Sequence, residues 1–468
     1  MSRLRRAVTV LLIGCPLTLA GHNVAAESGY TSGDPGFAAF KQELRQGYTS
    51  YRDQVQKEAR EFAALHMQIS AGYENRIANI WADPEQSSKT RWVLYEDGYI
   101  RKRVVDFEKG LIIWSTPERY ADSGFALADA GKMLAEMMSL TRRQAFEQDE
   151  VASEVESRSR GQFNHLETAT LDNKPVLPAY LFGDTSVDQP RVDKAIDAML
   201  ASAEKVQLSQ QGQSVVVWTF PMTIDEGSAD TPAVTVPQPE PTPKPKPEPE
   251  PEPKSERERE AVSIPVVVSG DVWKTKSIEA DRLERLPARA RPFVSSINRE
   301  NEKFELSAEL LLAIMETESA FNPMAKSPIP AFGLMQIVPA SAGQDATEKL
   351  FGKPRLLAPS YLYNPENNIQ VGAAYFNILY YRYFRDIDDP LSRLYCAIAA
   401  YNTGPGNVSR ALTGGSMALR PATRIANTMS PSEVHAHLMS NLPYEETVNY
   451  LRKVTSHLAK YEEVLSGE

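Results

Sequence analysis

The sequence predicts an α+β protein with two main parts: an N-terminal α+β domain that contains an antiparallel meander, and a C-terminal domain that is mostly α-helical. Three observations support this prediction. Two hairpin turns separate β-rich runs between residues 91 and 117. Apolar residues recur at helical spacing before and after these runs. Alternating prolines from Pro237 to Pro253 divide the chain, because such a stretch cannot join a folded core.

The first 26 residues have the pattern of a signal peptide, with a basic start, an apolar run and small residues before a cleavage site after Ala26. The run "LIGC" also has the form of a lipoprotein signal over residues 1–14, which would leave Cys15 lipidated. Both interpretations stay open, because the residues after Cys15 are apolar where polar ones are usual. Either predicts export to the periplasm, and the second adds an outer-membrane lipid anchor.

Residues 33–225 are predicted to form the N-terminal α+β domain. It begins with a long helix, one face of which carries apolar and aromatic residues at three-to-four spacing, including Leu44, Tyr48, Tyr51 and Val55. Turns at Asp97-Gly98 and Lys109-Gly110 then define the meander, whose alternation is interrupted at Lys102. A further helix over 124–141 and a strand near 214–220 complete this domain.

Residues 232–260 are predicted to be a proline-rich and charged linker, and residues 261–280 a strand segment that returns to the N-terminal domain. The C-terminal domain is expected over 281–468. It is predicted to contain helices near 286–304, 307–319, 367–384, 390–402 and 443–464. Ser307 is well placed to cap the second of these helices.

Glu318 is the residue in this domain whose position is hardest to explain by structure alone. Leu311, Ile314, Met315 and Glu318 share one helical face, so the carboxyl continues an apolar stripe. Desolvation would raise the pKa of Glu318, as a group that first donates and then takes back a proton requires. Glu316 points elsewhere and cannot pair with it. A solvated glutamate at a helix end is the equally weighted alternative.

Three stretches in this domain, "ETESAFNPMAKS", "FGLMQIVPASA" and "AIAAYNTGPGNV", resemble the successive motifs of the soluble lytic transglycosylase family. The tail "LPYEETVNYLRKV" resembles the closing motif, and the resemblance covers residues 288–465. It implies a goose-type-lysozyme-like fold for the C-terminal domain. The first domain and "YLYNPENNIQVGAAY" resemble a membrane-bound branch of the family.

The resemblance implies that Glu318 is the only catalytic acid/base. It would cleave the bond between N-acetylmuramic acid and N-acetylglucosamine in peptidoglycan glycan strands without water, leaving a 1,6-anhydromuramoyl end. The residues that the family pattern assigns to substrate binding are Ser319, Met335, Gln336, Tyr401, Asn402 and Tyr450. Phe332 stands where the family more often has a small residue or Leu, so it is predicted to narrow the substrate groove.

No cofactor is expected, and no metal site, because His435 and His437 are two residues apart and cannot share a helical face. The net charge of -10 argues against nucleic acid as a partner. Two other functions were weighed: an inactive peptidoglycan-binding scaffold, and a lysozyme-type hydrolase. The hydrolase needs a second carboxylate, for which Asp345 is the nearest candidate in sequence.

Overall fold

The computed structural model describes residues 35–123, 127–184, 188–222 and 277–466. The predicted signal segment with Cys15 and the predicted linker 232–260 lie outside these residues, as does most of the predicted strand segment 261–280.

The described end of that segment, residues 277–280, is not a strand. The Ile278 N–H donates to Oδ1 of Asn298 over 2.8 Å, and the Ile278 carbonyl accepts from Asn298 Nδ2 over 3.0 Å. These bonds place this end of the segment against helix α9 (Val294–Phe304) of the C-terminal region.

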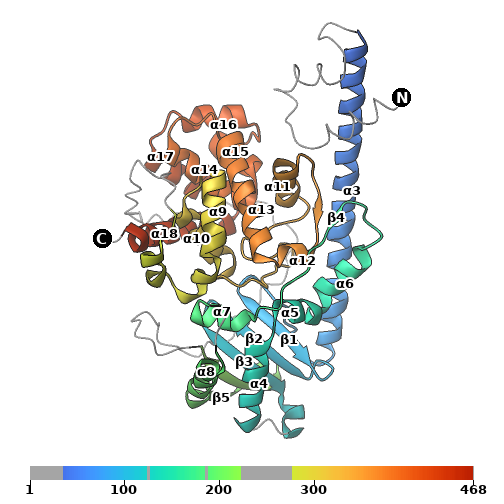
Figure 1. Ribbon diagram of the computed structural model, residues 1–468, viewed down its shortest axis with the longest axis vertical. Coiled ribbons are helices and arrows are strands. Elements are labelled where there is room, and N and C mark those ends of the chain that lie inside the picture. Colours follow the sequence, from blue (N-terminus) through green and yellow to red (C-terminus); the bar gives the residue numbers. More distant parts are fainter. Residues whose placement is uncertain (1–34, 124–126, 185–187, 223–276, 467–468) are drawn as a thin grey trace.

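The N-terminal region alternates helices and strands (Figure 1). Its elements are α3 (Pro35–Ala78), β1 (Arg91–Glu96), β2 (Arg101–Asp106), β3 (Leu111–Pro117), η1 (Glu118–Ser123), α4 (Leu127–Ser139), α5 (Arg142–Gln148), α6 (Glu150–Ser159), β4 (Leu166–Glu167), α7 (Val176–Phe182), α8 (Gln189–Ala201), β5 (Glu204–Gln210) and β6 (Gln213–Pro221).

The strands confirm the predicted meander. Strands β1, β2 and β3 pair antiparallel in sequence order, and β6 and β5 extend the sheet to the order β1-β2-β3-β6-β5. Lys102, which interrupts the alternation of β2, is buried. Its ammonium group lies 2.8 Å from a Glu85 carboxylate oxygen and 4.7 Å from the centre of the Trp81 ring. The ion pair and the cation–π contact compensate for the burial of this charge.

The C-terminal region confirms the predicted helical domain. Its elements are η2 (Ala280–Arg285), η3 (Ala288–Phe293), α9 (Val294–Phe304), α10 (Ala308–Ser319), α11 (Ala342–Phe351), β7 (Leu356–Leu357), α12 (Pro359–Leu362), α13 (Pro365–Ile378), η4 (Leu379–Tyr383), α14 (Pro390–Thr403), α15 (Pro405–Thr413), α16 (Leu419–Ala426), α17 (Pro431–Asn441) and α18 (Glu445–Ser466). Helix α10 packs against α9 and α18 at the centre of this region.

One predicted helix is divided in the structure. The run predicted over 286–304 forms a 3₁₀ helix, η3, before α9 begins at Val294. Pro292 lies near the end of η3, where it has no N–H for a regular helical hydrogen bond. The predicted helix over 367–384 likewise ends in a π-helical turn, η4.

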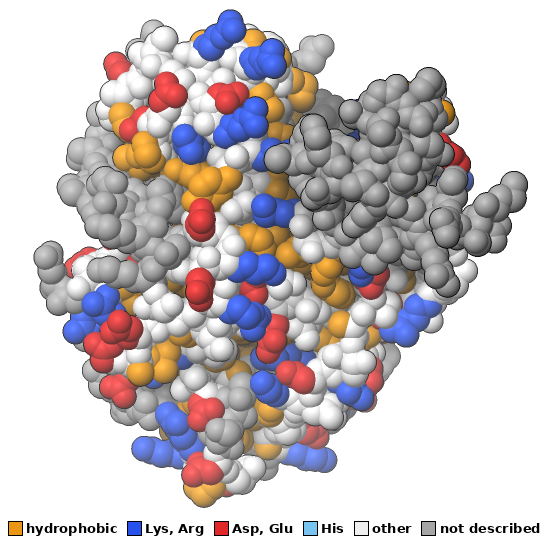
Figure 2. All heavy atoms as spheres, turned by 45° about the horizontal axis from the view of Figure 1, so that its top comes forward, with side chains coloured by type: hydrophobic (Ala, Val, Ile, Leu, Met, Phe, Trp, Pro, Cys, Tyr) orange, Lys and Arg blue, Asp and Glu red, His pale blue; other side chains and the backbone are white. Residues whose placement is uncertain are grey.

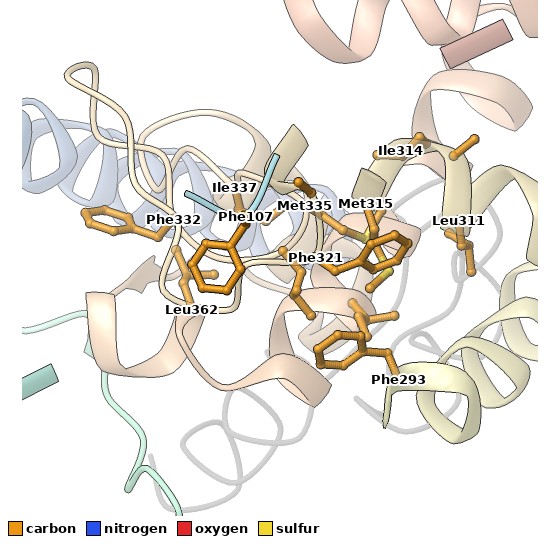
Figure 3. Close-up of a cluster of buried hydrophobic side chains, with 14 of the residues drawn as sticks. Phe107, Phe293, Leu311, Ile314, Met315, Phe321, Phe332, Met335, Ile337 and Leu362 are labelled. Atoms are coloured by element: carbon orange, nitrogen blue, oxygen red, sulfur yellow. The ribbon is translucent and has the colours of Figure 1, made fainter. Parts of the chain in front are cut away.

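The two regions share one apolar core. A single cluster of buried side chains extends from α3 and the sheet into the helical region. Figure 3 shows part of it: Phe107, which follows strand β2, is drawn with Phe321 and Met335 of the helical region. The cluster anchors the N-terminal region against the segments that carry the candidate site.

Polar contacts also join the two regions. Strand β4 pairs in parallel with β7, with Leu166 opposite Leu356. The Lys326 ammonium lies 2.7 and 2.9 Å from the two carboxylate oxygens of Asp149, which also caps α6. Both partners of this ion pair are largely buried, so either one alone would leave an uncompensated charge.

The long helix α3 extends along the outside of the molecule (Figure 1). Its Tyr51 hydroxyl donates to the Pro354 carbonyl over 2.9 Å. On the face shown in Figure 2, acidic side chains lie among lysine and arginine side chains. This mixture agrees with the distribution of charge along the sequence and gives this face no uniform field.

Candidate active site

Helix α10 presents Glu318 from its last turn. The Ser307 hydroxyl accepts from the Leu310 N–H over 3.2 Å, so the predicted N-cap is confirmed. Leu311, Ile314 and Met315 are fully buried, and Glu318 is only 4% exposed. The prediction that Glu318 continues the apolar stripe is therefore confirmed, and a solvated helix-end glutamate is excluded.

Burial raises the pKa of the Glu318 carboxyl, because the charged form loses its hydration. The Lys89 ammonium acts in the opposite direction, as does the Tyr450 hydroxyl, while the Glu446 carboxylate raises the pKa further. Tyr450 is buried, and its hydroxyl has no closely placed hydrogen-bond partner among the described residues. Glu318 is the carboxyl with which this hydroxyl interacts, and burial, together with this interaction, raises the pKa of Tyr450.

The backbone directly after Glu318 adopts an unusual conformation. Ala320 and Phe321 both have left-handed φ angles, 48° and 63°, although neither is glycine. Each such residue costs on the order of 1–3 kcal/mol unless its surroundings hold it. The Ala320 N–H donates to the Glu316 carbonyl over 3.0 Å, and the Asn322 N–H donates to the Ser319 carbonyl over 2.9 Å. These bonds turn the chain sharply and leave Glu318 at the end of a rigid helix.

Ser319 is fully buried beside the acid. Its hydroxyl lies within hydrogen-bond distance of two backbone carbonyls, Met315 at 3.0 Å and Leu334 at 2.8 Å. The side chain thus ties α10 to the segment with the sequence "GLMQ", residues 333–336. In this position Ser319 holds the site together, and its oxygen is not presented to solvent.

The segment 333–336 is held in turn by Asn368 of α13, which is also fully buried. The Met335 N–H donates to Asn368 Oδ1 over 2.8 Å. Asn368 Nδ2 donates to the carbonyls of Phe332 and Leu362, both over 2.8 Å. Sequence reasoning did not select Asn368. A possible signal was its position directly before the mostly apolar run "IQVGAAYF".

Two glycines permit this close packing. Gly333 has a φ of +75°, and a Cβ there would lie 2.3 Å from both Asn368 Nδ2 and the Leu362 carbonyl oxygen. A Cβ on Gly372 would lie 2.3 Å from the Met335 sulfur. Both positions therefore need glycine if Met335 is to stay where it is.

Gln336 lies in the same turn with a φ of 47°. Its Nε2 donates to the Gly333 carbonyl over 3.0 Å, while its buried Oε1 has no hydrogen-bond partner among the described residues. A buried amide oxygen without a partner is uncommon and costs free energy. It leaves one acceptor available to a donor from outside the chain.

Helix α14 contributes Tyr401 and Asn402. The Tyr401 hydroxyl donates to the Met335 carbonyl over 2.9 Å, and its ring lies 5.4 Å from that of Tyr375. Asn402 Oδ1 accepts from the Thr447 hydroxyl over 2.7 Å. Helices α10, α14 and α18 and the segment 333–336 therefore meet around Glu318, and they carry all the residues predicted for catalysis and substrate binding.

Phe332 does not line a groove as predicted. Its side chain is fully buried and packs edge-on against His66 and Tyr363, with ring centres 5.7 Å away in each case. His66 belongs to α3, so Phe332 anchors the N-terminal region instead. The sequence alone could not show this, because the aromatic partner is far away along the chain.

Sequence reasoning also missed two charged residues. Lys89, in the loop before β1, places its ammonium 3.3 Å from Glu318 Oε2 and 3.6 Å from Glu446 Oε1. The Glu446 side chain is 75% exposed, and that of Lys89 is 35% exposed. Lys89 lies in "QSSKTR", outside every motif, and nothing in that stretch indicates a role.

Glu316, two residues before Glu318, has entirely different surroundings. Its Oε1 lies 2.8 Å from Arg289 Nη2 and 3.1 Å from the Lys460 ammonium. His457 and these two cations lower the pKa of Glu316 to about 2 despite its burial. The prediction that Glu316 and Glu318 do not pair is confirmed.

Comparison with known proteins places these features in a family context. Residues 295–416 match the transglycosylase SLT domain, which contains Glu318 and the segment 333–336. The resemblance to soluble lytic transglycosylases is thereby confirmed for this part of the chain.

Curated relatives are named membrane-bound lytic murein transglycosylase C. The protein of that name from Klebsiella pneumoniae is 40% identical over 176 residues, which is 38% of this chain and 48% of the relative. The one from Pectobacterium atrosepticum gives the same identity and coverage. The chain thus spans about half the length of the relatives it matches.

Among solved structures, the 70-kDa soluble lytic transglycosylase of Escherichia coli is 27% identical over 38% of this chain and 26% of its own, with a TM-score of 0.28. An inactive mutant of the lytic transglycosylase Slt of Pseudomonas aeruginosa is 26% identical over 38% of this chain and 25% of its own, also with a TM-score of 0.28. Within the residues that the structure describes, no helix has the length and apolar character needed to cross a membrane.

Proposed function

We propose that this protein, whose residues 295–416 match the transglycosylase SLT domain, is a peptidoglycan lytic transglycosylase with Glu318 as its single acid/base. Its substrate would be the β-1,4 bond from N-acetylmuramic acid to N-acetylglucosamine. The observation that carries this proposal is the Glu318 carboxyl, 4% exposed at the end of a rigid helix with its pKa raised by burial. A protonated carboxyl in such surroundings is a general acid.

In the first step, protonated Glu318 gives its proton to the glycosidic oxygen. The bond from this oxygen to C1 of the muramoyl residue breaks, and the electron pair leaves with the oxygen. Positive charge then develops at C1 and on the ring oxygen. The Glu318 carboxylate that remains is the nearest counter-charge supplied by α10.

In the second step, the C6 hydroxyl of the same muramoyl residue attacks C1 and closes a 1,6-anhydro ring. The Glu318 carboxylate takes the hydroxyl proton, so the enzyme returns to its starting state. No water enters the products. Because the nucleophile belongs to the substrate, no second carboxylate is needed to activate it.

The site's other carboxylates fit a hydrolase less well. A hydrolase would need a second carboxylate about 5–9.5 Å away across the scissile bond. Asp345 interacts with Tyr383, Arg382 and Glu348, and it is not among the charges that act on Glu318. Glu446 is the carboxylate on this side of Glu318, and it is ion-paired with Lys89.

For the remaining predicted residues, the proposal assigns roles that follow their contacts. Gln336 would use its unpartnered Oε1 to accept from a sugar amide or hydroxyl, and Asn402 would offer its Nδ2 as a donor. Tyr450 would orient the Glu318 carboxyl. Ser319, Met335 and Tyr401 would act by holding segment 333–336 in place.

The proposal extends to organisation and location. Residues 281–468 would be the catalytic domain and 33–225 an N-terminal domain that supports it, joined by the linker 232–260. The relatives are named membrane-bound proteins that act on murein. We propose the periplasm as the location and peptidoglycan glycan strands as the partner, with a lipid on Cys15 as an outer-membrane anchor if the lipoprotein signal is used.

The test is mass spectrometry of fragments released from purified peptidoglycan sacculi by the wild-type protein and by Glu318→Gln. We expect anhydromuramoyl products from the wild type and a rate lower by about 10²–10⁴-fold in the variant, as for loss of a general acid. Glu302→Gln, an exposed position on neighbouring α9, is the matched control and should behave as wild type. Reducing ends would indicate hydrolysis, and no release by the wild type would favour the binding scaffold.

A further inference from the structure

The loop that carries Lys89 is held on both sides. Toward the helical region, the Lys326 N–H donates to the Ser88 carbonyl over 3.3 Å, and Asn322 Nδ2 donates to the Lys89 carbonyl over 3.4 Å. Toward the sheet, the Phe107 N–H donates to the Thr90 carbonyl over 2.8 Å. The backbone of this loop is therefore fixed between the N-terminal sheet and the segment that follows Glu318.

From this fixed backbone the Lys89 side chain reaches Glu318. The 3.3 Å separation between Nζ and Glu318 Oε2 is a direct ion-pair distance, and the Glu318 side chain is 5% exposed. An ion pair with one partner buried is screened far less than a pair on the surface. Lys89 therefore acts on Glu318 more strongly than an exposed lysine at the same distance would.

We propose that Lys89, supplied by the N-terminal region, is a positioning residue for Glu318: it holds the carboxyl in place and stabilises the carboxylate that forms when the proton leaves. This inference rests on the proposed function, in which Glu318 exists first as an acid and then as a base. It gives the N-terminal region a direct part in the reaction, in addition to its packing role.

The physical reason lies in the opposing demands on one carboxyl. A carboxyl that is buried without a counter-charge holds its proton too firmly to donate it, and its anion is costly. Lys89 lowers the pKa of Glu318, against the rise that burial causes, and it remains charged itself, because Glu318 and Glu446 raise its own pKa. The carboxylate that forms when the proton leaves is therefore less costly than it would be without this cation.

Four groups from three parts of the chain face Glu318: Lys89, Tyr401, Tyr450 and Glu446. Each either changes the pKa of Glu318 in a defined direction or stays neutral. Lys89 and the Tyr450 hydroxyl of α18 lower the pKa of Glu318, and Glu446 of α18 raises it. Tyr401 of α14 stays a neutral phenol, because burial and Glu318 raise its own pKa. Lys89 is the cation in this set, so its removal should have the largest effect on the titration of Glu318.

The chain offers a matched control for a purely structural role. Lys453 of α18 also bridges the two regions, with its ammonium 3.9 Å from Glu108 Oε1 in the turn between β2 and β3. Both of these side chains are about 60% exposed, and the pair is not among the charges that act on Glu318. Lys453→Met removes a bridging lysine without changing the surroundings of the acid.

The experiment compares the full-length wild type with Lys89→Met, Lys89→Arg and Lys453→Met by two measurements. The first is the ¹³C NMR titration of the Glu318 carboxyl in protein labelled at glutamate, assigned with Glu318→Gln. The second is the pH profile of anhydromuramoyl product formation from soluble glycan strands. The first measurement needs no enzymatic activity, so it separates this inference from the proposed function.

In Lys89→Met we expect the Glu318 pKa and the alkaline limb of the profile to rise together by about 1–3 pH units, the usual effect of losing an adjacent opposite charge. The rate at the optimum should fall about 10–100-fold, because the carboxylate forms without its counter-charge. Lys89→Arg keeps the charge and should keep the wild-type pKa and limb. Lys453→Met should match the wild type in both measurements.

An unchanged Glu318 pKa in folded Lys89→Met would overturn the inference. So would a raised pKa with an unchanged alkaline limb, or an equal loss of rate in Lys453→Met. A wild type that releases no anhydromuramoyl product would overturn the proposed function, and the NMR titration would still decide whether Lys89 acts on Glu318.

Discussion

The last turn of helix α10 carries two carboxylates, Glu316 and Glu318, on two sides, and their surroundings shift the two pKa values in opposite directions. Toward α18 and η3, Glu316 meets Arg289, Lys460 and His457, which lower its pKa to about 2. Glu318 is buried, interacts with the phenols of Tyr401 and Tyr450 and is approached by one lysine, and burial raises its pKa. Two residues of separation turn the side chains by about 200° around a helix, so the two groups never share an environment.

The difference shows how one element can supply both stability and chemistry. Glu316 is a permanent anion that fastens α10 to its neighbours, while Glu318 is positioned to change its protonation state. Pairs of carboxylates whose environments separate their pKa values are a recurring basis of acid/base assignment in enzymes. Substitutions at the two positions should therefore have opposite consequences.

The largest effect on stability is expected at Glu316. Glu316→Gln should lower the free energy of unfolding by about 3 kcal/mol at pH 7, since a pKa lowered from 4.5 to about 2 corresponds to about that much. The contribution is complete above the unfolded pKa and is lost as pH falls from about 5 toward 2. Urea unfolding of wild type and variant at several pH values measures it.

The free energies of unfolding of the wild type and Glu316→Gln should therefore become equal in acid. The products that the two proteins release from sacculi should be the same. Glu302→Gln controls for loss of an exposed charge on a neighbouring helix. A difference below about 0.5 kcal/mol at pH 7 would show that Glu316 is only a surface ion pair.

At Glu318 a substitution is expected to raise the free energy of unfolding, opposite to the effect at Glu316. Because its folded-state pKa is raised, the ionised carboxyl destabilises the fold at neutral pH, and protonation relieves this as pH falls. Glu318→Gln should therefore be more stable than the wild type at pH 7 by about 0.5–2 kcal/mol, as is common when a functional group is neutralised. Thermal unfolding at pH 7 and pH 4 measures it, with a smaller difference expected at pH 4.

A variant that is equally stable or less stable at pH 7 would mean that Lys89 compensates fully for the burial of Glu318. In that case the contrast between the two sides of α10 would be weaker than the surroundings suggest.

A smaller effect is expected at Tyr450. Tyr450→Phe removes a hydroxyl that lowers the pKa of Glu318. The rate of product formation should fall by up to about tenfold, because the Glu318 carboxylate loses a nearby hydroxyl that favours its charged form, and the alkaline limb should shift upward by less than in Lys89→Met. Stability should change little, because this hydroxyl has no other close partner among the described residues. If Tyr450→Phe lowers the free energy of unfolding strongly and leaves the alkaline limb of the pH profile unchanged, Tyr450 has a structural role in the core and does not act on Glu318.

The helices and the meander were predictable because their signals are local. Ser307 and the apolar stripe of α10 lie within one short run, as do the turns that separate β1, β2 and β3. Short helices such as α5 and α15 were not predicted, since seven to nine residues carry too little periodicity to be distinguished from loops.

The candidate site was predictable only in part. Glu318 was selected because it continues an apolar stripe that is visible in the sequence, and Gln336 was selected through the family resemblance. Asn368 and Lys89 were missed, because each acts on a segment at least thirty residues away, Asn368 on Met335 and Lys89 on Glu318. Phe332 was assigned to a groove, and its contact with His66 places it in the core between the two regions.

The sequence by itself determined the α+β class and the helical C-terminal region, because residue spacing and polarity act over a few turns of the chain, but from these patterns alone the burial of Glu318 stayed open. Only the tertiary structure decided which charges surround that acid. Coulomb interactions and desolvation depend on distance in space, and the folded chain brings Lys89 within 3.3 Å of a carboxylate more than two hundred residues away.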